Sequence, residues 1–172
     1  MLTEPEFFSG SLDDLAAARE ATTLPALRKD FVLDPYQVVE ARAGGADAVL
    51  LIVAALPDRG LFAELAAAAA DYGLAALVEV HAERELDAAF EIDPELVGVN
   101  QRDLRTFDVD NGLAVRLRGR IPAGVAVVAE SGIAERAGVE ELEAAAVDGI
   151  LVGETLMRAT LRACRRVSSS PM

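Results

Sequence analysis

Short, nearly continuous hydrophobic runs recur along the chain and alternate with amphipathic stretches. Within each run hydrophobic and polar residues do not alternate, which is typical of strands buried on both faces of a sheet. The stretches between them have the spacing of hydrophobic positions that a helix requires. Strand–helix units that repeat every roughly 25 residues predict a parallel sheet covered by helices. The six runs lie at residues 24–28, 47–53, 74–80, 95–100, 124–130 and 148–153.

Helix-ending and helix-starting residues agree with this alternation. Asp34 followed by Pro35 is typical of an N-cap and the first turn of a helix. Gly44, Gly73 and Gly119 stand where the intervening helices should end. The predicted strands and helices therefore have consistent boundaries.

The opening residues, 1–21, have the pattern of the end of one further strand followed by its helix. No linker or low-complexity stretch interrupts the chain before its last residues. We therefore expect a single incomplete TIM-barrel domain over residues 1–165 and a disordered tail over residues 166–172.

Two architectures are built from such a series, the open doubly wound sheet and the closed eight-stranded barrel. No GxGxxG motif follows the first run, which weakens the case for a dinucleotide-binding sheet. The six runs and the opening segment make seven strand–helix units, one fewer than a (β/α)8 barrel contains. The chain is therefore expected to be a TIM barrel that lacks its first strand and the segment before it.

In a TIM barrel the chemistry lies where the strands end and the following loops begin. Four of the six predicted strand ends carry polar or charged residues. An unpaired charge buried there would cost several kcal/mol, so each of these residues needs a partner or a function. The strand ends are Lys29, Ile52, Glu79, Asn100, Glu130 and Gly153.

Lys29 is the only lysine among sixteen basic residues. An ammonium group can act as a general acid, because its pKa responds to burial and to neighbouring charges in a way that a guanidinium cannot. The alternative is an ion pair with Glu79 or Glu130 across the barrel mouth. Two carboxylates around one lysine are compatible with acid–base chemistry and with a structural network of ion pairs, and we favour the former.

Three further polar residues near the strand ends have two interpretations each. Asn100 can orient a substrate or cap a turn. Arg102 can clamp a carboxylate or face solvent. The single histidine, His81, is expected to cap the helix after residues 74–80 rather than to act in catalysis. No Cys, His or Asp cluster has the spacing of metal ligands, so a metal site is not expected.

Glycines follow the last two predicted strands. Ser131 and Gly132 come after the fifth run and Gly153 ends the sixth. The loops after the last two strands of such barrels often bind phosphate through backbone N–H groups. The sequence therefore predicts a phosphorylated substrate, with the Glu154 side chain pointing away from it.

The composition limits the class of protein. The chain is 52% hydrophobic and 26% charged, as in globular domains. A net charge of −13 argues against nucleic-acid binding, which requires a basic surface. The longest hydrophobic run, Ala48 to Leu56, is too short to cross a bilayer. The single cysteine, Cys164, cannot form an internal disulfide, which indicates a cytoplasmic location.

Three motifs resemble a known family. LRKDF (27–31), VGVNQRDL (97–104) and AESGI (129–133), together with the residues around them, resemble indole-3-glycerol phosphate synthase of tryptophan biosynthesis. The resemblance runs from Leu2 to about Ala159. It implies a ribulose-phosphate-binding barrel without a metal or an organic cofactor. It also implies closure of the ring of 1-(2-carboxyphenylamino)-1-deoxyribulose 5-phosphate, with loss of carbon dioxide and water.

The resemblance also implies a role for each candidate residue. Lys29 matches the general acid that protonates the carbonyl oxygen, and Glu79 matches a carboxylate that transfers protons in dehydration. Asn100 and Glu130 match residues that hold the substrate and stabilise intermediates. Arg102 matches a position near the anthranilate part of the substrate. The phosphate-binding positions are matched by Ser131, Gly132, Leu151, Val152 and Gly153.

The chain also departs from the family pattern. The family's first strand carries a glutamate and a second lysine, and a helical segment before it covers the barrel mouth; this sequence contains neither. We therefore expect an N-terminally truncated barrel with two unpaired sheet edges. Such edges favour self-association, so the chain is expected to be dimeric or prone to aggregation, and weakly stable.

Two other functions are compatible with the same residues. The chain could be a non-catalytic remnant that binds phosphate without turnover. It could also be an isomerase on another ribulose-phosphate barrel, although such enzymes use carboxylate or cysteine pairs and the lysine of LRKDF argues against them.

Overall fold

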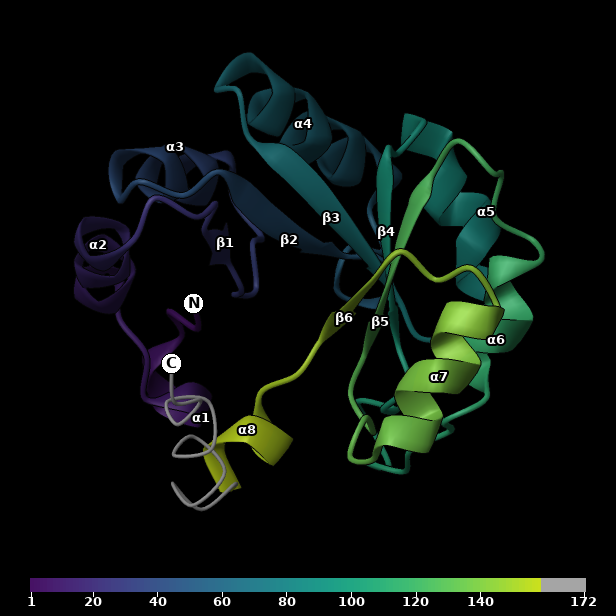
Figure 1. The fold of residues 1–172 in the computed structure, drawn as a ribbon. Helices are drawn as coiled ribbons and strands as arrows, with labels where there is room; N and C mark the ends of the chain where they lie inside the picture. The colour runs from purple at the N-terminus through teal and green to yellow at the C-terminus, as the bar shows by residue number, and fades with distance from the viewer. Residues whose placement is uncertain (159–172) are drawn as a thin grey trace, which may run out of the picture.

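A curled parallel sheet of six strands forms the centre of the computed structural model, which describes residues 1–158 (Figure 1). The strands follow one another in chain order across the sheet, without the reversal of a doubly wound sheet. This order excludes the doubly wound alternative and confirms the predicted incomplete TIM barrel. The predicted tail, 166–172, and Cys164 lie outside the described residues. The strands are β1 (Leu27–Arg28), β2 (Ala48–Ile52), β3 (Ala75–Val80), β4 (Leu96–Asn100), β5 (Ala126–Glu130) and β6 (Gly149–Leu151).

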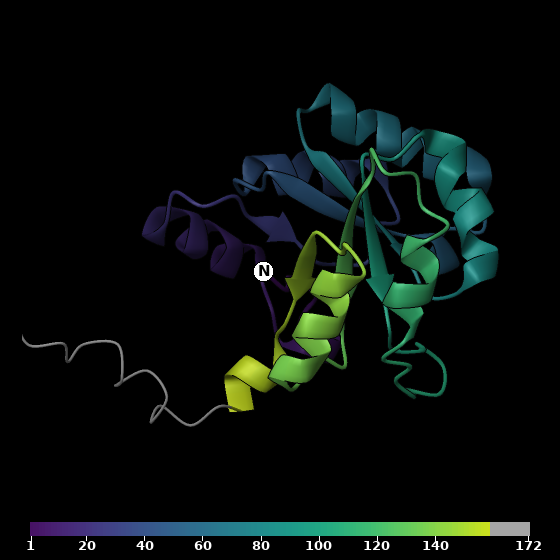
Figure 2. The same cartoon turned by 45° about the vertical axis from the view of Figure 1, so that its right-hand side comes forward.

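Helices connect consecutive strands and lie on the outer side of the curled sheet (Figure 2). The predicted helix signals are confirmed: Asp34 forms a capping box with Gln37, and Gly44 and Gly119 occupy C-cap positions. Within residues 1–158 no helix is long and hydrophobic enough to cross a membrane. The α-helices are α1 (Pro5–Phe8), α2 (Leu12–Ala21), α3 (Pro35–Ala43), α4 (Arg59–Asp71), α5 (Leu86–Ala89), α6 (Leu113–Arg118), α7 (Arg136–Ala144) and α8 (Glu154–Arg158), and the 3₁₀-helices are η1 (Val53–Ala55), η2 (Glu83–Glu85) and η3 (Phe90–Ile92).

The two faces of the sheet have different cores. Successive strand residues point to opposite faces, so every second side chain faces the helices and the others face the inside of the curl. The outer core is large and includes Val49, Val78 and Val97 with the helix residues that cover them. The inner core is small and centres on Leu50 and Leu77. The inside of the curl therefore has room for polar side chains near the strand ends.

The first strand is shorter than the predicted run at 24–28. Pro25 has no backbone N–H and cannot donate to a neighbouring strand, so regular pairing begins only at Leu27. Beyond β1, Leu2 forms a single parallel bridge with Lys29, whose backbone N–H donates to the carbonyl of Met1 at 2.8 Å. The strand end predicted at the start of the chain is therefore present as one bridge. Self-association through the open edges stays a prediction.

Candidate active site

Lys29 lies inside the curl between two buried carboxylates. Its Nζ donates to Glu79 Oε2 and to Glu130 Oε2, each at 2.8 Å. The Lys29 side chain is 22% exposed, whereas both glutamate side chains are 1% exposed. The ion pair considered as the alternative to catalysis is thus present. It is compatible with catalysis, because the same contacts hold the ammonium at the mouth of a cavity.

Asn100 connects this group to the following loop. Its Nδ2 donates to Glu79 Oε1 at 3.2 Å, and its Oδ1 accepts the backbone N–H of Arg102 at 3.1 Å. The turn-capping interpretation of Asn100 therefore has a structural counterpart, and its amide also holds a carboxylate of the site. A contact of Asn100 with a substrate stays a prediction.

The two carboxyl groups have opposite pKa shifts. Burial alone would raise the pKa of Glu79, but the neighbouring His81 and Lys29 outweigh it and lower the pKa to about 2. Burial and the neighbouring Glu79 charge raise the pKa of Glu130 to about 7 despite the opposing effect of Lys29. Burial opposes the charge of Lys29, yet the two carboxylates raise its pKa above the ordinary value. At neutral pH the site therefore holds an ammonium, a carboxylate and a carboxyl group that exchanges its proton.

A cavity of about 590 Å³ opens beside Lys29. Eight of the ten predicted site residues line it, whereas Glu79 and Asn100 are buried and do not. The loops that follow β5 and β6 form much of its lining. The lining residues are Lys29, Arg102, Glu130, Ser131, Gly132, Ile133, Ala134, Leu151, Val152, Gly153, Glu154, Thr155 and Arg158.

The loop after β5 has an unusual backbone. Ser131 and Gly132 both adopt positive φ angles, 63° and 72°, a conformation that favours glycine. Gln101, which the sequence did not single out, donates its side-chain Nε2 to the Ser131 carbonyl at 3.0 Å. A methyl group on Gly132 would clash with the side chains of Asn111 and Val109. Gly132 is therefore required by both its conformation and its surroundings.

Arg102 and Glu154 form an ion pair at the edge of the cavity. Arg102 Nη2 lies 3.1 Å from Glu154 Oε2, and Arg158 Nη2 lies 3.1 Å from Glu154 Oε1. Glu154 lines the cavity, so the expectation that it points away is wrong. Two guanidinium groups neutralise its charge, which reduces the repulsion that motivated the expectation. Arg102 does contact a carboxylate, but here it is one from the same chain.

His81 differs most from its predicted role. The N-cap position of η2 is occupied by Ala82, and no side chain caps that helix, so the predicted capping role is wrong. Instead His81 Nε2 lies 3.0 Å from Glu79 Oε1. The signal that could have indicated this is the spacing in VEVH, because residues 79 and 81 of one extended segment point to the same side.

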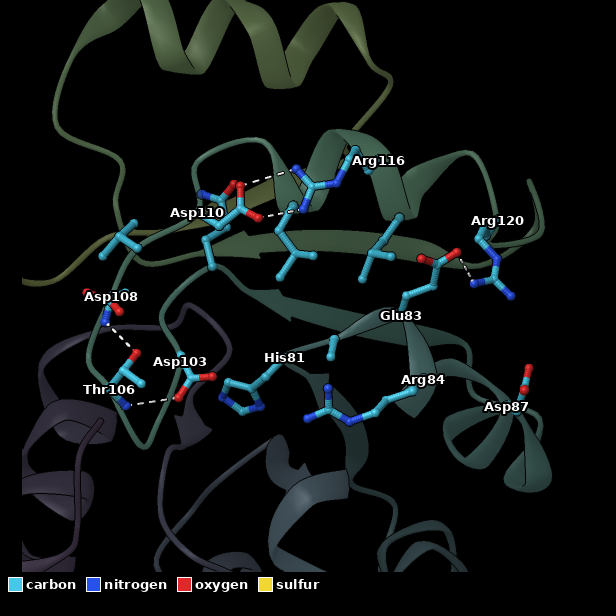
Figure 3. A pocket seen from close by; sticks show the side chains of 15 residues that line it. His81, Glu83, Arg84, Asp87, Asp103, Thr106, Asp108, Asp110, Arg116 and Arg120 are labelled. Carbon is cyan, nitrogen blue, oxygen red and sulfur yellow. Dashed lines mark hydrogen bonds and ion pairs between the residues drawn. The ribbon is translucent and has the colours of Figure 1, made fainter.

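A second, larger cleft of about 790 Å³ lies beyond His81 (Figure 3). Ion pairs between Arg116 and Asp110 and between Arg120 and Glu83 line this cleft. It does not include Lys29, Glu130 or the glycine loops, so the smaller cavity is the candidate active site. Among the residues of the chain that the structure describes, no group of His, Cys, Asp and Glu side chains is arranged to hold a metal ion.

Gly98 provides the space that the Glu130 carboxylate occupies. A methyl group at this position would clash with Glu130 Oε1 and approach Leu77 Cδ1 to 3.3 Å. Because Glu130 is buried and bonded to Lys29, it cannot move without breaking that contact. We expect Gly98→Ala to destabilise the fold by about 1–3 kcal/mol, the usual cost of overpacking. The midpoint of urea unfolding measures this.

Gly138→Ala is the matched control for Gly98→Ala. Gly138 lies within α7, and nothing stands within 4 Å of the added methyl group. This variant should be neutral or up to about 1 kcal/mol more stable. Equal midpoints for the two variants would contradict the close packing of Glu130 on Gly98.

Comparison with known proteins gives one family. A family model described as indole-3-glycerol phosphate synthase matches residues 1–166. The chain is 56% identical over 159 residues to indole-3-glycerol phosphate synthase 2 of Streptomyces coelicolor, covering 92% of this chain and 61% of the relative. It is 52% identical to the indole-3-glycerol phosphate synthase of Aromatoleum aromaticum, covering 92% and 60%. The resemblance seen in the motifs is confirmed, and the chain spans about three-fifths of the length of the curated relatives it matches.

Proposed function

The chain belongs to the indole-3-glycerol phosphate synthase family, and on that premise we propose that it carries the site for converting 1-(2-carboxyphenylamino)-1-deoxyribulose 5-phosphate to indole-3-glycerol phosphate. In this reaction a carbon–carbon bond forms between the aromatic ring and the carbonyl carbon of the sugar chain, and carbon dioxide and then water leave. The observation that carries the proposal is the position of Lys29 between two carboxylates in a cavity that the glycine loops also line.

The phosphate group is assigned to the glycine loops. Backbone N–H groups around Ser131, Gly132 and Gly153 can bind phosphate oxygens without a clash from side chains. Leu151 and Val152 lead into the second loop and line the same wall. Arg102 would then lie near the aromatic carboxylate. To bind it, Arg102 must exchange its contact with Glu154 for one with the substrate.

Lys29 is assigned as the general acid. During ring closure negative charge develops on the carbonyl oxygen, which becomes more basic than an amine and accepts a proton from the ammonium group. The raised pKa of Lys29 keeps it protonated at neutral pH before the substrate arrives. The adjacent carboxylates favour the charged amine, and its partial exposure to the cavity allows it to reach the substrate.

The two glutamates are assigned to proton transfer and to stabilisation of intermediates. Glu79, whose pKa is lowered, is ionised and can accept a proton during dehydration. Glu130, whose pKa is raised to about 7, can hold or release a proton near neutral pH. Environments that move two carboxyl pKa values apart are a recurrent feature of acid–base sites. Asn100 holds Glu79 in place through its amide.

The test is turnover by the purified chain. The protein is mixed with 1-(2-carboxyphenylamino)-1-deoxyribulose 5-phosphate, and the rise of indole fluorescence is followed over time. We expect indole formation that saturates with substrate and is inhibited by inorganic phosphate, because phosphate competes for the glycine loops. Cytoplasmic location and self-association stay predictions.

A chain without turnover would contradict the proposal. Isothermal titration with the substrate then separates two cases. Binding without product would indicate a phosphate-binding protein, the second function compatible with the sequence. Absence of binding by a chain with a cooperative unfolding transition would contradict both functions.

A further inference from the structure

His81 lies between two carboxylates and is almost completely buried. Its side chain is 7% exposed, its Nε2 lies 3.0 Å from Glu79 Oε1, and its Nδ1 lies 3.8 Å from Glu85 Oε2. The backbone N–H of His81 also donates to Glu85 Oε2 at 2.7 Å, which fixes the loop that carries the ring. Neither ring nitrogen has the geometry of a standard hydrogen bond, so charge attraction holds the ring in place.

Together these groups form a row of alternating charges. It runs from Glu85 through His81 and Glu79 to Lys29 and then Glu130, with contacts of 3.8, 3.0, 2.8 and 2.8 Å. Each inner member of the row has an opposite charge on both sides when His81 is protonated. Glu79 uses its Oε2 for Lys29 and its Oε1 for His81 and Asn100. Both carboxylate oxygens of Glu79 therefore have partners within the row or in Asn100.

We propose that His81 is a positioning residue that keeps Glu79 ionised and holds its Oε1, so that Oε2 stays on Lys29. The inference rests on the proposed function, in which Glu79 accepts a proton. His81 does not line the cavity beside Lys29 and acts on the substrate only through Glu79. It lines the larger cleft instead (Figure 3).

The charged groups around His81 agree with a protonated ring. Glu79 approaches from β3, Glu85 from η2, and the charge of Asp103, in the loop after β4, interacts with the ring. Arg84 is the nearest opposing charge in the sequence, but its side chain is 78% exposed and screened by solvent. Burial lowers the pKa of His81, and the two glutamates outweigh it and raise the pKa to about 9.

The first measurement is the titration of the His81 imidazole by NMR. His81 is the only histidine of the chain, so its signal requires no assignment. In the natural chain we expect a pKa well above the ordinary value of 6.5. In Glu79→Gln it should fall by at least about one unit, a tenfold change in proton affinity, because the nearest carboxylate is gone. An ordinary pKa in the natural chain, or equal pKa values in both proteins, would overturn the proposal.

The second measurement is the pH profile of turnover in His81→Gln. Glutamine keeps a polar side chain but removes the charge, so the pKa of Glu79 should rise and the acid limb of the profile should move to higher pH. The maximal rate should fall by about tenfold or more, with little change in KM because His81 does not line the substrate cavity. If the rate of His81→Gln is lower at every pH but the acid limb of its pH profile does not move, the role of His81 is merely structural.

Arg84→Gln is the matched control for His81→Gln. It removes one positive charge from the same cleft, three residues away, without a contact to Glu79. Its pH profile should match that of the natural chain. If the natural chain has no turnover, the proposed function fails, but the imidazole titration still decides whether Glu79 and His81 are coupled.

Discussion

An arginine in place of Lys29 should abolish ring closure and leave the fold intact. The guanidinium keeps the positive charge between Glu79 and Glu130, so the buried carboxylates remain paired. It does not release a proton at accessible pH, because the pKa of a guanidinium stays far above neutral. If Lys29 is the general acid, the loss of proton transfer should lower kcat by about 10²- to 10⁴-fold.

Fluorescence turnover assays on the natural chain and Lys29→Arg measure this difference, and urea unfolding provides the control for folding. The free energies of unfolding of the two proteins should agree within about 1 kcal/mol, since the exposed part of the Lys29 side chain faces a cavity that can admit a larger group. A variant that folds and retains turnover within about tenfold of the natural chain would assign Lys29 to electrostatics rather than to proton transfer.

The strands and the position of the site could be predicted from the sequence because both depend on local pattern. Continuous hydrophobic runs identified the six strands found in residues 1–158, and the polar residues at or next to their ends identified Lys29, Glu79, Asn100 and Glu130 as candidates. In a parallel sheet the carboxyl ends of the strands meet at one edge. The residues that end the strands therefore come together whatever the details of packing.

Contacts that depend on loop conformation could not be predicted in the same way. Arg102 and Glu154 are 52 residues apart in the chain, and their ion pair depends on how two loops meet over the cavity. The larger cleft beyond His81 likewise lies between loops and helices that no periodic pattern describes. The sequence position of His81 before a predicted helix is compatible with a cap, whereas its contacts in the structure are with Glu85 and Glu79.

The role of Gly98 is a different case. A glycine within a hydrophobic strand indicates a close approach of another group, but the sequence does not say which group approaches. Only the register places the Glu130 carboxylate against this position, because β5 pairs with β4 and the long glutamate side chain extends toward Gly98. Packing inside the curl thus sets the geometry of the site as much as the strand ends do.

Methionine in place of Lys29 should destabilise the chain in a strongly pH-dependent way. The substitution keeps a flexible unbranched side chain but, within residues 1–158, leaves Glu130 buried without a cation and leaves Glu79 with only His81 as a positive neighbour. Removing one partner of a buried ion pair usually costs about 3–5 kcal/mol. A loss of this size is a large part of the stability of a small domain, so at pH 8 the cooperative unfolding transition should weaken or disappear.

The sign of the pH dependence follows from the pKa of Glu130. Burial and the neighbouring Glu79 charge already raise this pKa, and removing the ammonium removes the effect that opposes them. A carboxyl group whose pKa is higher in the folded than in the unfolded chain favours folding fully at a pH below its unfolded pKa. This contribution to the free energy of unfolding is lost as the pH rises through the folded pKa. Lys29→Met should therefore approach the stability of the natural chain near pH 4 to 5 and fall progressively behind it toward pH 8.

Urea unfolding at pH 5 and pH 8 tests this expectation, with the double variant Lys29→Met, Glu130→Gln as the matched control. Removing the Glu130 charge should restore part of the stability at pH 8 and change little at pH 5. A loss of equal size at both pH values would indicate a packing defect instead. The expected result means that Lys29 contributes to stability, whatever its part in the proposed chemistry. The presence of one lysine is therefore not by itself a sign of catalysis, and the arginine variant, which keeps the charge but not the transferable proton, separates the two roles.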